Sequence, residues 1–131
     1  MLYIKERPGE DVVIRGARVL DPTEGVDATL DVRIDAGTIA QVGERLDTNE
    51  HRVLDGDGLV LAPAFVDPHV HLRTPGREDE ETIATGTAAA AAGGYCAILA
   101  MPNTDPVVDS AAVLGSLAEQ AASDAEVPVG L

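Results

Sequence analysis

Aromatic side chains, cysteines and lysines are all scarce in this sequence of 131 residues. Aromatic residues make up 2 % of the chain and tryptophan is absent, so we expect no surface that stacks nucleobases. The single cysteine cannot form a disulfide within the chain, and no oxidising compartment is indicated. No apolar run reaches the roughly 18 residues that span a membrane, and the N-terminus lacks the apolar segment of a signal peptide. These absences predict a cytoplasmic protein.

Positive charge is also in short supply. The chain has 23 acidic residues against 9 Lys and Arg, which gives a formal net charge of −14. Proteins bind nucleic acids and anionic membranes electrostatically through clusters of Lys and Arg. The net negative charge of this chain therefore excludes such electrostatic binding to either partner. Apolar residues are 45 % of the chain, a composition typical of globular proteins.

The first part of the chain predicts short strands separated by turns. Strands are expected at 12–14, 18–20, 38–42 and 52–54, with a hairpin loop at 35–38. Leu30, Val32 and Ile34 alternate with polar residues, which indicates a strand with one buried and one wet face. We expect these strands to form a small antiparallel sheet or sandwich over residues 1–57.

The second part, residues 58–131, alternates between strands and helices. The nearly continuous apolar run at 59–66 predicts a strand buried on both faces. Helices are expected at about 80–92, led by the acidic stretch 78–81, and from Asp109 or Ser110 onward. Strands are predicted at 95–101 and 127–129. This order indicates parallel βα units of an α/β layer.

Asp67, His69 and His71 stand at the carboxyl end of the first predicted strand of this layer. Side chains at alternate positions of a strand project from the same face. Two imidazoles at this spacing can bind one metal ion, and a nearby carboxylate can orient such a ligand by a hydrogen bond. The alternative is a pair of surface histidines in a bend. The spacing, the strand end and the parallel context together favour the metal site.

Two further residues are candidates for binding an anionic substrate. If the extended backbone continues past His71, Arg73 projects beside the histidines, and its planar fork suits a carboxylate. Asn103 follows the next strand and reaches the same edge of the sheet, although Asn and Pro are also ordinary turn residues there. The turn Pro75-Gly76 is a candidate loop over the site.

The other reactive residues predict no site. His51 precedes a strand and is expected to be a surface residue without a partner. Cys96 lies within an apolar strand, so a buried, inert thiol is expected. Lys5, the only lysine, is close to the N-terminus.

Taken together, these motifs resemble the N-terminal part of a dihydroorotase of the amidohydrolase superfamily. The resemblance extends from about residue 12 onward. It rests on the segment Asp67-Pro68-His69-Val70-His71-Leu72-Arg73 with Thr74-Pro75-Gly76, on the alanine-rich helix, and on Met101-Pro102-Asn103-Thr104. Hydantoinases and allantoinases share the His-x-His pair and the helix, whereas the Met-Pro-Asn-Thr segment favours dihydroorotase.

The resemblance implies the start of a (β/α)8 barrel preceded by part of a small β-sandwich. It implies a zinc-dependent, reversible cyclisation of N-carbamoyl-L-aspartate to dihydroorotate in pyrimidine synthesis. His69 and His71 would be zinc ligands, and Arg73 and Asn103 would hold the substrate carboxylate. The chain departs from the family at Ala64, where glycine is usual. The remaining metal ligands and the catalytic Asp have no matching positions, so this portion alone is expected to be inactive.

Three alternatives remain. The first is a cyclic amidase acting on hydantoin or allantoin. The second is a non-catalytic subunit that scaffolds aspartate transcarbamoylase; the retained His-x-His pair argues against it. The third, a stand-alone binding domain, is disfavoured because an opened barrel leaves strand edges uncovered. Association with aspartate transcarbamoylase or with further copies of the chain stays open.

Overall fold

The computed structural model describes residues 1–131 and divides into two compact units. The sheet unit is Arg7–Pro63, and the α/β unit is Met1–Glu6 together with Ala64–Leu131. The sequence placed one boundary between residues 57 and 58, whereas the division falls after Pro63. Two pairings explain the difference: Val60–Leu61 pair with the first sheet, and Leu2–Tyr3 pair with Val129–Gly130 of the second.

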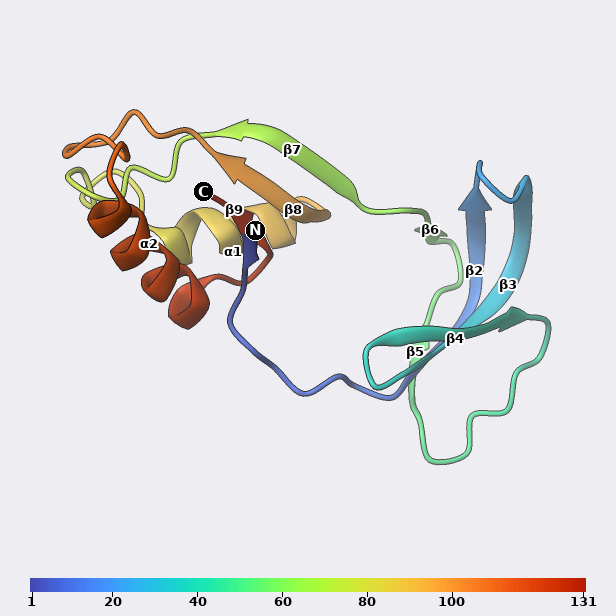
Figure 1. The fold of residues 1–131 in the computed structure, drawn as a ribbon. Helices are drawn as coiled ribbons and strands as arrows, with labels where there is room; N and C mark the ends of the chain where they lie inside the picture. The colour runs from blue at the N-terminus through green and yellow to red at the C-terminus, as the bar shows by residue number, and fades with distance from the viewer. The chain divides into compact units, whose positions relative to one another are not determined.

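The sheet unit is a mixed sheet with the order β4-β3-β2-β5, in which β6 also pairs with β2 (Figure 1). The two hairpin pairings, β2 with β3 and β3 with β4, are antiparallel, but β5 and β6 both pair with β2 in parallel. The expected antiparallel sheet or sandwich is thus a mixed sheet, antiparallel in its hairpins and parallel where β5 and β6 pair with β2. The strands are β2 (Val12–Asp21), β3 (Val26–Asp35), β4 (Thr38–Gly43), β5 (Arg52–Asp55) and β6 (Val60–Leu61).

A bulge at Gly16 joins two predicted strands into one. The register between β2 and β3 shifts between Ile14 and Ala17, and Gly16 adopts a φ of +71°. A left-handed residue of this kind favours glycine, because a side chain there would be strained. The sequence predicted separate strands at 12–14 and 18–20 since Gly16 reads as a strand end.

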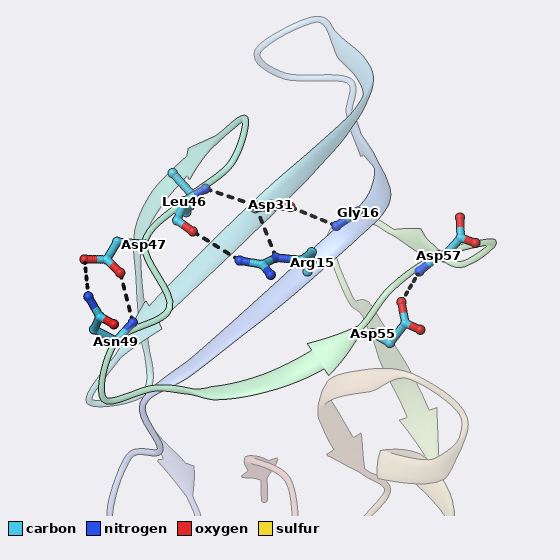
Figure 2. A network of polar contacts seen from close by, with 8 residues as sticks. All are labelled: Arg15, Gly16, Asp31, Leu46, Asp47, Asn49, Asp55 and Asp57. Carbon is cyan, nitrogen blue, oxygen red and sulfur yellow. Dashed lines mark hydrogen bonds and ion pairs between the residues drawn. The ribbon is translucent and has the colours of Figure 1, made fainter.

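Asp31 is buried in β3, although the alternation pattern placed it on the wet face. Its carboxylate accepts hydrogen bonds from the backbone N–H groups of Gly16 at 2.9 Å and Leu46 at 3.0 Å. Arg15 Nε lies 3.9 Å from the same carboxylate (Figure 2). A buried carboxylate requires partners of this kind. Asp31 thus connects the bulge to the loop after β4.

The hairpin between β3 and β4 confirms the predicted loop at 35–38. Ala36 and Gly37 have φ values of +49° and +78°, the pattern of a tight turn with two left-handed central residues.

His51 lies near this hairpin and has two partners, so its expected isolation was wrong. Its Nδ1 is 2.8 Å from the Asn49 carbonyl oxygen, and its Nε2 is 2.8 Å from Asp35 Oδ1. The Asn49 carbonyl and then the Asp35 carboxylate raise the pKa of His51 above its ordinary value of 6.5.

The α/β unit contains a four-stranded sheet whose three parallel strands are neighbours both in sequence and in space. Its order is β1-β9-β8-β7, where β7, β8 and β9 run parallel and β1 is antiparallel to β9 (Figure 1). Its elements are β1 (Leu2–Tyr3), β7 (Phe65–Val70), α1 (Ile83–Ala92), β8 (Tyr95–Ala100), α2 (Ala111–Asp124) and β9 (Val129–Gly130). The helices connect successive parallel strands, as the sequence predicted.

Side-chain caps set where the two helices begin. Thr82 and Thr85 form a reciprocal capping box at the start of α1, and Gly93 caps its end. The acidic stretch 78–81 leads into the helix, as predicted, but the helix begins at Ile83 rather than near Glu80. Ser110 caps α2, as predicted, with its side chain accepting from the Val113 N–H.

The predicted strand at 59–66 is two strands, and it is not buried on both faces. Val60–Leu61 belong to the sheet unit, and β7 begins only at Phe65. Leu59, Val60, Phe65 and Val66 are all exposed. Cys96 of β8 is also exposed, so its expected burial was wrong.

The core of the α/β unit lies between its sheet and its two helices. Ile83 of α1, Leu117 of α2 and Ile98 of β8 pack together there with Val129 of β9. No helix of the chain combines the length and apolar character that a membrane crossing needs.

Replacing Asp31 tests its role in the sheet unit. We expect Asp31→Ala to leave the half-buried Gly16 N–H and the buried Leu46 N–H unpaired. The loss should cost about 2 kcal/mol, which corresponds to roughly thirtyfold faster amide exchange at both positions. Hydrogen-exchange NMR measures this. Asp27→Ala, which removes an exposed partner of Arg18, is the control and should leave both amides protected. Equal protection in the two variants would contradict the role of Asp31.

The raised pKa of His51 predicts a pH-dependent contact. Because the folded state favours the protonated ring, this contact stabilises the folded protein fully below pH 6.5. That contribution to stability is lost as the pH rises through the higher pKa of His51 in the folded state. An NMR titration of the His51 ring should give a midpoint above 6.5, and Asp35→Asn should lower that midpoint. A midpoint at or below 6.5 in the unsubstituted protein would rule out this pairing.

Candidate metal and substrate site

The two histidines at the end of β7 lie side by side, as the spacing predicted. His69 is within the strand and His71 follows its last residue, Val70. The centroids of the two imidazole rings are 5.1 Å apart, and the rings meet edge to face at 68°. His69 is exposed and His71 half-buried, so both rings remain accessible to a ligand.

Asn103 contacts His71 from the loop that follows β8. The Nδ1 atom of His71 is 2.9 Å from the Asn103 side-chain oxygen. The pairing of β7 with β8 brings these loops together: Val70 stands opposite Ala100, and the Met101 N–H donates to the Val70 carbonyl at 2.8 Å. The sequence predicted that His71 and Asn103 share an edge of the sheet but did not predict their direct contact.

Asp67 contacts the backbone beside the histidines. Its Oδ1 accepts a hydrogen bond from the His69 N–H at 3.0 Å. The same stretch of β7 has an irregular register with β8, between Asp67 and Val70. Asp67 therefore shapes the strand end that carries the two rings. The structure shows no hydrogen bond from its carboxylate to either imidazole.

Arg73 is not reached by extended backbone, so the premise behind its predicted placement was wrong. β7 ends at Val70, and Arg73 has a left-handed φ of +60°. Its Nε lies 3.4 Å from the Glu80 carboxylate, which also binds Arg77. No contact of Arg73 joins it to the histidines or to Asn103. The sequence did not indicate that Glu80 contacts Arg73 and Arg77. The chain turn before α1 brings these three residues together.

The loops after β7 and β8 pack against each other. The Asp105 N–H donates to the Pro75 carbonyl at 3.1 Å. Gly76 has a φ of +107°, and a Cβ added there would lie 2.1 Å from the Asp105 carbonyl oxygen. Only glycine allows this close approach. The predicted Pro75-Gly76 turn therefore fixes the position of the loop that carries Asn103.

The chain contains no group of three His, Cys, Asp or Glu side chains placed to hold a metal ion. The site is thus a pair of imidazoles flanked by an amide. A catalytic zinc site uses three protein ligands, so the two imidazoles alone would not complete one.

Comparisons with known proteins agree on one family. The sequence model described as dihydro-orotase-like matches residues 58–129, more than half of the chain. The chain is 50 % identical to the dihydroorotase of Solibacter usitatus over 118 residues, covering 90 % of this chain and 27 % of that protein. It is 45 % identical to the dihydroorotase of Citrifermentans bemidjiense over 120 residues, covering 91 % and 28 %.

A solved structure of another protein has a similar fold. The dihydropyrimidinase from Brevibacillus agri superposes with a TM-score of 0.75 at 28 % identity, over 92 % of this chain and 26 % of that one. The chain spans little more than a quarter of the length of each of these relatives. By its sequence match over residues 58–129, the chain belongs to the dihydroorotase-like family.

Proposed function

We propose that this chain is the N-terminal portion of a dihydroorotase, which interconverts N-carbamoyl-L-aspartate and dihydroorotate in pyrimidine synthesis. The relatives named dihydroorotase are 45–50 % identical to the chain, against 28 % for the dihydropyrimidinase. The observation that carries the proposal is the adjacency of the His69 and His71 rings, with Asn103 beside them.

The proposed fold is the start of a (β/α)8 barrel, preceded by part of a β-sandwich. The sequential parallel order of β7, β8 and β9 supports the barrel, because barrel strands neighbour one another in chain order. The sheet unit supplies the sandwich part. The barrel assignment places the histidines at the carboxyl ends of the strands, where barrel enzymes carry their active sites. The single free cysteine agrees with a cytoplasmic location.

The proposed metal is zinc, and the donor chemistry of the pair fits it. Imidazole nitrogens are common zinc ligands, and two rings with centroids 5.1 Å apart can approach one ion. His69 and His71 would hold the metal together with ligands from the remainder of the protein. Bound zinc polarises a carbonyl group and lowers the pKa of bound water.

Arg73 and Asn103 are proposed to bind the substrate carboxylate. Glu80 contacts Arg73 through Nε, which leaves the two terminal nitrogens to donate a pair of parallel hydrogen bonds. The side-chain oxygen of Asn103 faces His71, so its NH2 group is the donor that remains. Both residues therefore present N–H donors, as an anionic substrate requires in a chain with a net charge of −14.

The alternative is another cyclic amidase, which the structural match to a dihydropyrimidinase favours. Assays of the full-length protein on N-carbamoyl-L-aspartate and on hydantoins separate the two. We expect turnover of N-carbamoyl-L-aspartate. Turnover of hydantoins alone would reject the proposal.

Substitution of Arg73 tests the carboxylate contact. We expect Arg73→Ala to lower kcat/KM for N-carbamoyl-L-aspartate by about 10- to 100-fold, mainly through KM, because a charge-assisted pair of hydrogen bonds is lost. Steady-state kinetics of the full-length enzyme measure this. Arg77→Ala is the matched control, since Arg77 binds the same Glu80 carboxylate. Equal losses in both variants would assign Arg73 a structural role instead.

A further inference from the structure

The contact between His71 and Asn103 places a hydrogen-bond acceptor at one specific ring nitrogen. The amide oxygen of Asn103 lies 2.9 Å from Nδ1 of His71, within ordinary hydrogen-bond distance. A carboxamide oxygen carries no proton and can only accept. Nδ1 must therefore donate. A neutral imidazole has one N–H, so the lone pair stays on Nε2.

The loop that carries Asn103 is held in place on both sides. The Thr104 hydroxyl donates to the Pro106 carbonyl at 2.8 Å, and the Val108 N–H donates to the Pro102 carbonyl at 3.2 Å. The contact from Asp105 to the loop after β7 adds a third anchor, at 3.1 Å. The amide oxygen is thus positioned by the fold, before any ligand binds.

His69 offers a comparison within the same site. Its backbone N–H donates to Asp67, and its ring meets His71 edge to face. No hydrogen bond to its ring nitrogens is present in the structure. The two rings are adjacent, but only His71 has a side-chain partner that selects one nitrogen as the donor.

We propose that Asn103 is a positioning residue for His71, because its amide oxygen fixes the imidazole with the proton on Nδ1 and the lone pair on Nε2. The consequence for zinc binding rests on the proposed function, whereas the tautomer itself does not. Outer partners of metal-binding histidines typically contribute 10- to 100-fold to metal affinity. Asn103 therefore has a second task besides the proposed contact with the substrate.

The tautomer is measured on the metal-free, full-length protein with ¹⁵N-labelled histidine, in alkaline buffer that favours the neutral ring. Long-range ¹H–¹⁵N correlation spectra distinguish a protonated ring nitrogen from an unprotonated one, and loss of signals in His71→Gln assigns the ring. We expect Nδ1 of His71 to be protonated. Asn103→Ala should return a mixture of tautomers, whereas Asn103→Asp keeps an acceptor and should retain the Nδ1 proton. The His69 signals should be the same in all three proteins.

Zinc titration of the same proteins tests the consequence. We expect Asn103→Ala to weaken zinc binding 10- to 100-fold and Asn103→Asp to bind at least as tightly as the unsubstituted protein. A His71 proton on Nε2, or the same tautomer mixture with and without Asn103, would overturn the proposal. So would unchanged zinc affinity in Asn103→Ala. If the tautomer is as expected but N-carbamoyl-L-aspartate is not turned over, the proposed function fails and this inference stands.

Discussion

The parallel pairing of β7 with β8 is the constraint on which the candidate site depends. Parallel strands end at the same edge of their sheet, so residues 32 positions apart in the sequence, His71 and Asn103, come within hydrogen-bond distance. The hydrogen bond from Met101 to Val70 extends the pairing past the last regular pair of residues. The two loops then contact each other at Pro75 and Asp105. Without this pairing, the histidines would be two polar side chains on an exposed strand end.

Local periodicity and turn chemistry predicted much of the fold. The hairpin at 35–38, the alternation of strands and helices, and the Ser110 cap follow from side-chain spacing and from residues suited to each position. The adjacency of His69 and His71 follows in the same way, from their two-residue spacing. The contact with Asn103 required knowledge of which strands pair, and two isolated sequence patterns do not contain that information.

The errors arose where tertiary partners or backbone conformation override a local pattern. Asp31 is buried because two backbone N–H groups and Arg15 compensate its charge, although its place in the alternation indicated a wet face. His51 acquires Asp35 as a partner across the strands. The left-handed backbone conformation of Arg73 interrupts the extended chain. The residue type of Arg73 does not predict this conformation. Cys96 and Phe65 are exposed although they lie in apolar strands. The burial of a strand residue depends on which elements pack over it, and an apolar sequence does not specify those elements.

In the proposed function, a few local N–H donors would bind an anionic substrate to a chain that is itself acidic. Arg73 follows β7, Asn103 follows β8, and the histidine pair stands at the end of β7. Two of these groups contact a neighbouring side chain: Arg73 contacts Glu80, and His71 contacts Asn103. Zinc and the rest of the protein would complete this arrangement.

A crystal structure of the full-length protein loaded with zinc would show directly whether His69 and His71 bind one metal ion. We expect one ion bound by both His69 and His71, at about 2.0–2.1 Å from each nitrogen, with His71 binding through Nε2 and Asn103 on its Nδ1. Zinc bound elsewhere, or bound to only one of the two rings, would contradict this expectation.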